Sequence, residues 1–377
     1  MPQAHIDANL VLYFTRGVSL QAWKDAGLLE REVSLYQSMR PHLQGVAFVT
    51  YGGESENSLG ASVQGIRIVY NKWAVPKRWY GRLMSWVPPW RKKRNVIVKS
   101  NQIQGADVAQ LAARRYGKPF IARCGYLPSN NAARIYGDHS SQARRARDLE
   151  RTIFAGADRV VVTTPAIRET ILKRYQISPD LVRVIPNYVD TTIFIPEANG
   201  GRVANRLMYV GRLDEEKNPL ALIEAVRGLS VELLIIGNGS LGERLRREIE
   251  RENLPVRLLG NIPNHRLPAL LTTAAAFIMP SLIEGHPKAL LEAMACGSPV
   301  IGTDVPGIRE VIQHRSNGFL CGTSPVEIRS AIESVLGDRS LQCRMGNSAR
   351  EYVVHSCSLD RIVEMELELL GELSAAA

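Results

Sequence analysis

The chain lacks the features that mark membrane-spanning and disulfide-linked proteins. No apolar run in its 377 residues approaches the roughly 20 residues that a helix needs to cross a bilayer. The first residues carry Asp7, have no basic region and contain only a short apolar run, so we do not expect a secretion signal. The five cysteines are scattered and form no Cys-x-x-Cys pair. This argues against a disulfide framework or a zinc site and favours the reducing cytoplasm.

The composition is otherwise that of a folded soluble protein, with one asymmetry in charge. Apolar residues make up 45% and charged residues 22%, and the length is sufficient for two domains. The net charge is +10, but residues 1–190 hold 28 Lys and Arg against 14 Asp and Glu, whereas residues 191–377 hold 19 against 23. We therefore expect the first half to meet an anionic surface. The alternative is a chance asymmetry in a soluble protein.

The segment Phe277–Gly307 predicts a strand, a glycine-bearing loop, a helix and a second strand. The apolar run Ala274–Met279 indicates a buried strand, and the helix is expected from Pro287 to Ala295, with Pro287 as its first residue. The start of a helix offers unpaired backbone N–H groups and a positive dipole end. Together these favour an anion such as a diphosphate.

Two carboxylates flank this predicted anion site. Glu284 lies in the loop before the helix and Glu292 lies inside it. A carboxylate suits vicinal sugar hydroxyls, because it accepts two charge-assisted hydrogen bonds. The alternative is an ordinary strand-to-helix turn with Glu292 facing solvent. The E-x7-E spacing, followed by LLEAMACGSPVI, closely resembles the donor-site signature of the retaining family 4 glycosyltransferases, which have the GT-B fold.

Other segments extend this resemblance. The run Gly211–Pro219 is similar to the family's GR-x-x-x-x-K-N phosphate motif, in which Arg212 and Lys217 are the two cations. Gly237 begins a G-x-G turn, and Ile262 lies near the expected position of the nucleotide base. The run VRVIPNYVDTTIF is similar to the family's inter-domain segment, where IPNGVD is usual; here Tyr188 replaces the glycine.

The resemblance implies an α/β GT-B protein of two doubly wound Rossmann-like domains facing a central cleft. Residues 1–190 would form the N-terminal acceptor-binding domain and residues 191–358 the C-terminal donor-binding domain. Residues 359–377 would form a helix that crosses back to the N-terminal domain, with its tail. The polar, glycine-rich run Pro196–Arg202 suits a linker.

The resemblance also assigns roles to residues. Arg212, Lys217 and Glu284 would be catalytic, because two cations can stabilise the charge that develops on a leaving diphosphate. Glu292 would hold the ribose. The remaining donor-binding residues would be Gly17, Gly211, Gly237, Ile262, Gly285, His286, Pro287, Lys288 and Ala289.

The expected donor is a UDP- or GDP-linked sugar, with no cofactor and no metal. No two aspartates stand two apart, so the D-x-D metal motif of the other large glycosyltransferase fold is absent. Many family members place a histidine near the strand that ends here at Cys124. Arg123, Cys124 and Gly125 occupy that zone, so this contact does not carry over.

A second informative segment runs from Lys72 to Arg94. It has eight basic residues, no acidic ones and five aromatics, including four of the five tryptophans. Tryptophans with clustered Lys and Arg favour an anionic membrane surface. The alternatives are a loop with core tryptophans or a single-stranded nucleic-acid site, but no nucleic-acid motif supports the latter. The expected patch for membrane or acceptor comprises Trp73, Lys77, Arg78, Trp79, Arg82, Trp86, Trp90, Arg91, Lys92, Lys93 and Arg94.

The sequence therefore predicts a retaining glycosyltransferase. It would move a sugar from a nucleotide-diphosphate sugar to a lipid-linked glycan acceptor in cell-surface polysaccharide synthesis. It would be cytoplasmic and peripheral on the inner face of the cell membrane. The alternatives are a sugar-nucleotide epimerase on the same fold and a non-catalytic membrane-surface binding protein.

Overall fold

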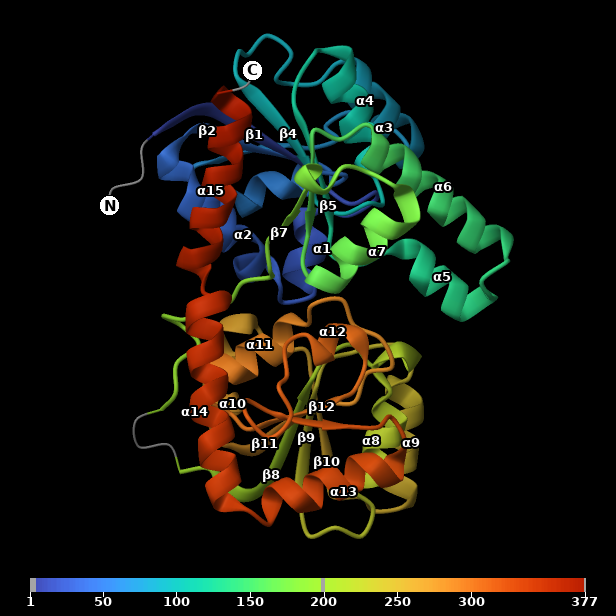
Figure 1. Cartoon of the computed structure of the whole chain (residues 1–377), viewed down its shortest axis with the longest axis vertical. Coiled ribbons are helices and arrows are strands. Elements are labelled where there is room, and N and C mark those ends of the chain that lie inside the picture. Colours follow the sequence, from blue (N-terminus) through green and yellow to red (C-terminus); the bar gives the residue numbers. More distant parts are fainter. Residues whose placement is uncertain (1–4, 198–200, 376–377) are drawn as a thin grey trace. The chain divides into compact units, whose positions relative to one another are not determined.

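The computed structural model describes residues 5–197 and 201–375, and it divides into two compact units (Figure 1). Unit 1 comprises the chain up to Ile185 and from Ile362 onward, and unit 2 comprises Pro186–Arg361. The sequence placed these limits after residues 190 and 358. Residues 198–200 of the expected linker lie outside the described residues.

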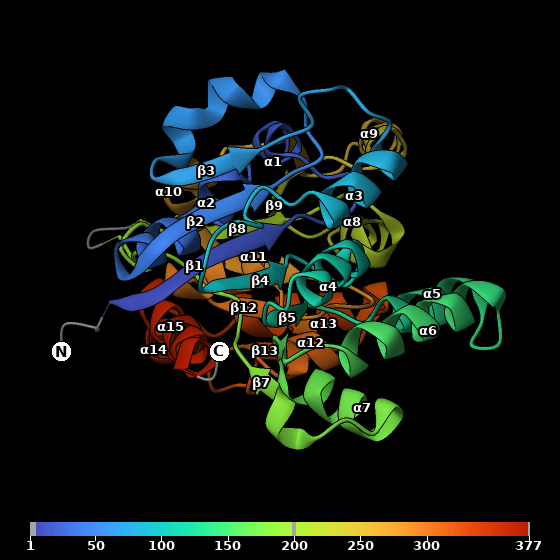
Figure 2. The ribbon, with the colours of Figure 1, turned by 90° about the horizontal axis from the view of Figure 1, so that it is seen from above.

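Unit 1 is built on a sheet of seven parallel strands in the order β3-β2-β1-β4-β5-β6-β7. Figure 2 shows β3, β2, β1 and β4 following one another across this sheet. The strands are short apolar runs, as parallel strands covered on both faces should be. Their bounds are β1 Ile6–Tyr13, β2 Leu43–Val49, β3 Ile66–Val69, β4 Val96–Ser100, β5 Phe120–Cys124, β6 Arg159–Val162 and β7 Val182–Val184.

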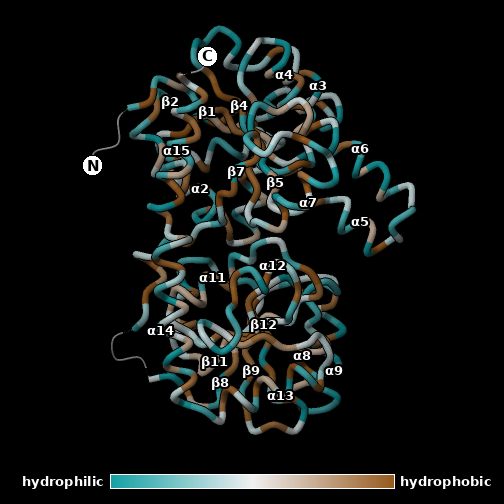
Figure 3. Tube along the Cα trace, in the orientation of Figure 1, coloured by the Kyte–Doolittle hydropathy of each residue, from teal (hydrophilic) through white to brown (hydrophobic). Residues whose placement is uncertain are grey.

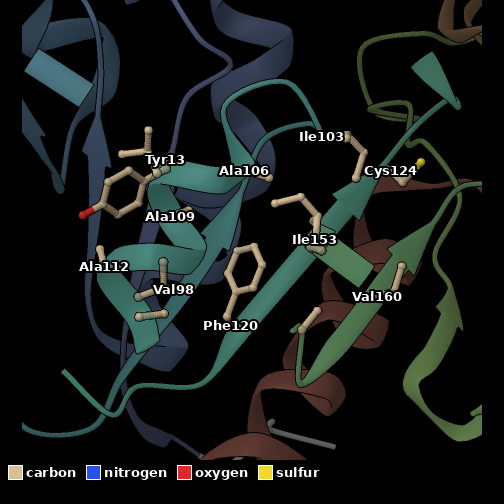
Figure 4. Close-up of a cluster of buried hydrophobic side chains, with 14 of the residues drawn as sticks. Tyr13, Val98, Ile103, Ala106, Ala109, Ala112, Phe120, Cys124, Ile153 and Val160 are labelled. Atoms are coloured by element: carbon tan, nitrogen blue, oxygen red, sulfur yellow. The ribbon is translucent and has the colours of Figure 1, made fainter. Parts of the chain in front are cut away.

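Helices cover both faces of this sheet. One face carries alternate residues such as Tyr13, Val98 and Phe120, which pack against Ala109 and Ile153 (Figure 4). On the other face, Phe48 packs against aromatic rings of the first two helices. The helices of unit 1 are α1 Leu20–Asp25, α2 Leu29–Met39, α3 Lys77–Trp86, α4 Ala106–Arg115, α5 Pro128–Tyr136, α6 Ser141–Ala155, α7 Pro165–Tyr175 and α15 Leu359–Ala375, of which residues from Ile362 belong to unit 1.

Unit 2 repeats the arrangement with six parallel strands in the order β10-β9-β8-β11-β12-β13. The strands are β8 Val203–Val210, β9 Glu232–Ile236, β10 Val256–Gly260, β11 Ala274–Met279, β12 Val300–Thr303 and β13 Phe319–Cys321. The helices are α8 Pro219–Ala225, α9 Gly242–Arg251, α10 Leu267–Leu271, α11 Lys288–Ala295, α12 Pro306–Arg309, α13 Pro325–Leu336 and α14 Arg339–Ser356.

The sheet of unit 2 is also covered on both faces. Met208 and Phe277 face α10, α11 and α14, whereas Tyr209 and Ile278 face α8, α9 and α13. The strands of each unit accordingly appear as brown, hydrophobic stretches inside paler or teal helices (Figure 3). The prediction of two doubly wound, Rossmann-like domains is therefore confirmed.

A buried ion pair joins α15 to the sheet of unit 1. Lys99 on β4 donates to Glu366 Oε1 on α15 at 2.5 Å, and both side chains are almost fully buried. Burial lowers the pKa of Lys99, because the ammonium loses its hydration. Nearer the surface, Glu372 of α15 pairs with Arg159 and Arg183. Across residues 5–197 and 201–375, no helix has the length and apolar character needed to span a bilayer.

We expect Glu366→Ala to destabilise the protein by about 3–5 kcal/mol, because it leaves the Lys99 ammonium buried without its carboxylate. Glu372→Ala, which removes the more exposed ion pairs of the same helix, should cost less than about 1 kcal/mol. The double variant Lys99→Met/Glu366→Leu should recover most of the loss. Urea unfolding measures all three, and equal losses for the two single variants would contradict this account.

Candidate donor site

The predicted donor residues of unit 2 gather where three neighbouring strands end. Loops 211–218, 237–241 and 280–287 follow β8, β9 and β11, and β8 lies between the other two strands. Backbone hydrogen bonds join the loops: Leu213 N donates to Asn238 O at 3.0 Å, and Leu282 N donates to Glu216 O at 2.8 Å. The three loops therefore form one continuous surface at the carboxyl edge of the sheet, where open α/β sheets bind ligands.

Two glycines permit this close approach. A Cβ atom on Gly237 would lie 2.0 Å from the carbonyl oxygen of Gly211, and Gly237 has a φ of +132°. A Cβ atom on Gly307, which follows β12, would lie 2.3 Å from the carbonyl oxygen of Gly285. Both distances are too short for any side chain. Glycine at these positions therefore lets the loops touch through their backbones.

Lys217 and Glu284 form the central ion pair of the site. Lys217 Nζ lies 2.6 Å from Glu284 Oε1, and the Ser281 hydroxyl donates to the same oxygen at 2.8 Å. The side chains are only 19% and 8% exposed, so their attraction is screened less than that of a surface pair. The ammonium has three N–H donors, and one of them donates to Glu284. It can thus bridge this carboxylate and an incoming phosphate.

Arg212 lies at the rim of the site and is held by two carboxylates. Its guanidinium contacts Asp214 Oδ2 at 3.0 Å and also pairs with Glu216, while the side chain is 64% exposed. Asp214 in turn accepts hydrogen bonds from the backbone and hydroxyl of Ser240, each at 2.9 Å. The backbone bond, which favours the ionised form, helps to lower the pKa of Asp214.

The start of α11 lies next to Glu284. The helix begins at Lys288, and Pro287 is its N-cap with φ −75° and ψ 111°, so the prediction that Pro287 is the first helical residue is wrong by one position. No side chain caps the first turn. The start of α11 therefore presents the positive end of its helix dipole, which favours an anion. The Lys288 ammonium lies 4.8 Å from the centre of the Tyr188 ring.

His286 is held in place by Asn187. The Asn187 backbone N–H donates to His286 Nδ1 at 3.2 Å, and the Asn187 amide donates to the His286 carbonyl oxygen at 2.6 Å. A backbone N–H can only donate, so Nδ1 is unprotonated and a neutral ring carries its proton on Nε2. The side chain is buried. His286 thus anchors the loop that carries Glu284 and Gly285.

Glu292 is buried within α11, at 2% exposure, and accepts a hydrogen bond from the Asn264 amide at 2.9 Å. The alternative of a solvent-facing Glu292 is therefore wrong. Ile262, two residues before Asn264, is partly buried and packs against the apolar cluster to which α11 contributes.

Several partners were missed from the sequence. Ser281, Ser240, Asn264, Asn187 and Gly307 orient the predicted residues but were not singled out. Asn187, in the family-like run VRVIPNYVDTTIF, and Gly307, at the end of the segment Phe277–Gly307, carried a local signal, whereas the three others did not. Gly17, by contrast, lies in unit 1 after β1, with a φ of +81°. Among the residues that the structure describes, no group of three or more His, Cys, Asp or Glu side chains is placed to hold a metal ion.

The basic segment, which we define as Lys72–Arg94, includes α3 and lies in unit 1. Trp73, Trp79 and Trp86 are 56%, 48% and 60% exposed. Trp90 is buried, so its inclusion in an exposed patch is wrong. In this fully described segment, none of the eight Lys and Arg side chains pairs with a carboxylate; these are Lys72, Lys77, Arg78, Arg82, Arg91, Lys92, Lys93 and Arg94.

Comparison with known proteins identifies the class to which this architecture belongs. A family model described as Glycosyltransferase Family 4 matches residues 42–193, and one described as Glycosyl transferases group 1 matches residues 198–352. The first match lies mainly in unit 1 and the second lies in unit 2. The chain belongs to the family 4 glycosyltransferases, and its fold is GT-B.

Curated relatives carry the names of several different transferases. The chain is 28% identical over 256 residues to alpha-maltose-1-phosphate synthase of Mycolicibacterium smegmatis, covering 60% of this chain and 66% of that protein. It is 29% identical over 314 residues to D-inositol 3-phosphate glycosyltransferase of Salinispora arenicola, with 74% and 69% covered. It is 25% identical over 307 residues to the UDP-Gal:alpha-D-GlcNAc-diphosphoundecaprenol alpha-1,3-galactosyltransferase of Escherichia coli, with 74% and 77% covered.

Solved structures support the fold. Sucrose-phosphate synthase of Thermosynechococcus elongatus matches with a TM-score of 0.80 at 19% identity, covering 98% of this chain and all 100% of that chain. Anabaena HepE in complex with UDP and glucose matches with a TM-score of 0.74 at 18% identity, covering 96% and 99%. These likenesses extend over nearly the whole chain.

Gly307→Ala should disturb the donor site without unfolding unit 2. The added methyl group would meet the carbonyl oxygens of Glu284 and Gly285, at 2.4 and 2.3 Å, and would push the Glu284 loop outward. We expect nucleotide affinity to fall by about tenfold or more, as misplaced contacts do. The control is Gly242→Ala, where the nearest atom would be 3.9 Å away. Calorimetric titration measures both, and unchanged affinity in Gly307→Ala would refute the role of this contact.

Proposed function

We propose that the protein transfers a sugar from a UDP-sugar to a lipid-linked glycan acceptor, with retention of anomeric configuration, in cell-surface polysaccharide synthesis. The observation that carries the proposal is the Lys217–Glu284 pair beside the uncapped start of α11. The names of the E. coli relative and of the HepE complex both contain UDP, and the former contains a diphosphoundecaprenol acceptor. The sequence did not distinguish a UDP-sugar from a GDP-sugar, so the titration below includes GDP as well as UDP.

The leaving diphosphate would be stabilised by this chain's own cations. Lys217 is already fixed beside the site, and Arg212 lies at its rim with an exposed guanidinium. The first N–H groups of α11 add the positive end of a helix dipole. These groups are preorganised for the charge that develops as the bond to the sugar breaks. We therefore propose that the transfer requires no metal ion.

The carboxylates would hold the donor's hydroxyl groups. Glu284 is oriented by Lys217 and Ser281, so its second oxygen can accept from a sugar hydroxyl. Glu292, which accepts a hydrogen bond from Asn264, would hold the ribose, and Ile262 would contact the base. In this arrangement one ion pair serves both ends of the scissile bond, because its cation meets the phosphate and its anion meets the sugar.

Retention follows if the acceptor hydroxyl attacks on the face from which the diphosphate leaves. The bond between the anomeric carbon and the phosphate oxygen breaks, and its electron pair goes to the diphosphate. The acceptor oxygen then bonds to that carbon, and its proton passes to the leaving phosphate oxygen. No nucleophile from the protein is needed, and this sequence assigns none.

We also propose that the protein works as a cytoplasmic, peripheral protein on the inner face of the cell membrane. The eight cations of the basic segment have no carboxylate partners within this described stretch, so their charge is available to anionic lipid. Trp73, Trp79 and Trp86 are exposed beside them, as interfacial tryptophans are. This location would bring the enzyme to a lipid-linked acceptor, and we propose no nucleic-acid partner.

Titration of UDP, GDP and ADP without added metal tests the donor site. We expect selective binding of UDP and a loss of about ten- to a hundredfold in Arg212→Ala, because hydrogen bonds to charged groups contribute about 1.5–3 kcal/mol. Arg244→Ala, which removes an exposed arginine of α9 paired with Glu248, is the matched control. Selective binding of GDP would indicate a GDP-sugar as the donor. Binding of none of the three nucleotides would contradict the proposal.

Transfer assays separate the chemistry from binding. Product NMR should show the donor's anomeric configuration, and EDTA should leave the rate unchanged. Glu284→Gln should abolish transfer while UDP still binds. Activity lost in EDTA and restored by Mg²⁺ would contradict the role given to Lys217 and Arg212. Turnover of the nucleotide sugar without an acceptor would favour an epimerase.

Replacing Trp73, Trp79 and Trp86 together by alanine should weaken co-sedimentation with phosphatidylglycerol vesicles by more than about tenfold, since each exposed indole offers apolar area at about 25 cal/mol per Å². The control is Ile135→Ala/Tyr136→Ala, which removes two exposed apolar side chains at the end of α5. UDP affinity should stay unchanged in both. Equal vesicle binding by the two variants would argue against the tryptophans as a membrane contact.

A further inference from the structure

Unit 1 contains a hollow that the donor chemistry does not use. Its volume is about 220 Å³, and it is partly open to solvent. This is below the roughly 300–1,000 Å³ of pockets for drug-sized ligands, so a nucleotide sugar or an oligosaccharide is too large for it. The polar and aromatic side chains that line it come from β1, the turn after α2, β2, β3 and the end of the basic segment: Asn9, Arg40, Gln44, Arg67, Trp90 and Lys93.

The hollow is positively charged and has no carboxylate in its lining. The side chain of Arg67, on β3, makes no hydrogen bond or ion pair with any described residue. Arg40 donates only to the carbonyl oxygens of Gly65, at 3.0 Å, and Leu43, at 3.5 Å. Lys93 donates to the Asn9 side-chain oxygen at 3.0 Å. Three cations thus share a small space without an anion.

The carboxylate of Asp7, which also lies on β1, does not neutralise these cations. Asp7, two residues before Asn9, accepts hydrogen bonds from the side chains of Gln44 and Asn95. Both partners are neutral amides, and Asp7 is not among the residues that line the hollow. Like charges held together are unfavourable unless an opposite charge joins them. An external anion would therefore stabilise this arrangement.

The position of the hollow separates it from the expected acceptor site. Asn9 and Gln44 lie in the first halves of β1 and β2. Substrates of open α/β sheets bind instead at the carboxyl ends of the strands. The hollow adjoins the end of the basic segment, because Trp90 and Lys93 belong to both. Trp90, which is buried, forms part of its wall.

We propose that this hollow binds the phosphate group of a phosphate ester. Guanidinium forks such as Arg40 and Arg67 match tetrahedral oxyanions, and the Lys93 ammonium adds a third charge. The apolar wall at Trp90 and Pro89 accommodates the organic part of the ester. The ester is either the headgroup of an anionic phospholipid or a soluble sugar or glycerol phosphate. The inference does not depend on the donor proposal, since no donor residue lines the hollow.

The test compares two double variants that lose the same charge from unit 1. Arg40→Gln/Arg67→Gln removes cations from the hollow. Arg144→Gln/Arg145→Gln removes two exposed arginines of α6 that lack carboxylate partners among the described residues. Glycerol 3-phosphate and inorganic phosphate are titrated calorimetrically, and co-sedimentation uses phosphatidylcholine vesicles with and without phosphatidylglycerol. Because Arg40 also bonds to the backbone, Arg67→Gln alone is a third variant that disturbs no hydrogen bond.

We expect saturable binding of glycerol 3-phosphate by the wild type and by the α6 variant, weakened about fivefold for each arginine removed from the hollow. If vesicle binding falls in parallel, the ester is a lipid headgroup; if it does not, the ester is a soluble phosphate. Both results support the site. If phosphate compounds do not bind and both double variants lose equal vesicle affinity, the charge acts without a site and the proposal is overturned.

Discussion

The candidate donor site depends on the approach of the loop after β8 to the loop after β11. These strands are neighbours and parallel, so their loops emerge at the same edge of the sheet. This geometry brings Lys217 and Glu284, 67 positions apart in the chain, to 2.6 Å. Each charge makes the partial burial of the other tolerable. A phosphate and a sugar arriving together would then meet a cation and an anion that are already oriented.

Charge is used differently in the two units. In unit 2 the cations are mostly matched internally: Arg212 has two carboxylates, and Arg227 pairs with Glu224 and Glu252. In the basic segment of unit 1, all of which is described, no carboxylate partner is present. Internal pairs orient side chains, whereas unmatched cations attract external anions. The net charge of +10 is a value for the whole chain, and unit 1 therefore attracts anions more strongly than this value alone indicates.

The sequence predicted those parts of the fold that have a strong local signal. The apolar run Ala274–Met279 folds as β11 with those bounds, and the strand expected to end at Cys124 is β5, which ends there. The short strand β3 (Ile66–Val69) and the helix α5 (Pro128–Tyr136) were not predicted. Strand β3 has four residues at the edge of its sheet, and α5 is polar and alanine-rich with few buried residues. Neither carries enough apolar periodicity to be recognised.

The sequence motifs pointed to residues that the structure brings together, but not to the contacts that orient them. Motif spacing located Arg212, Lys217 and Glu284, because it reflects a loop of fixed length after each strand. It could not show that Asn264 orients Glu292 from 28 positions away. Nor could it separate buried Trp90 from its exposed neighbours, because tertiary packing decides which indole is covered. The sequence therefore does not predict features that depend on contacts between segments far apart in the chain.

Tyr188 shows how a departure from a family pattern can be resolved by structure. Glycine is usual at this position, and its replacement left the backbone conformation open. Tyr188 is not among the residues with positive φ, so the backbone here does not require glycine. The ring is buried, and the Lys288 ammonium lies over it at 4.8 Å. Such a contact favours a fixed ammonium position. Tyr188 therefore places a further positive charge at the start of α11, where the donor's diphosphate is expected to bind.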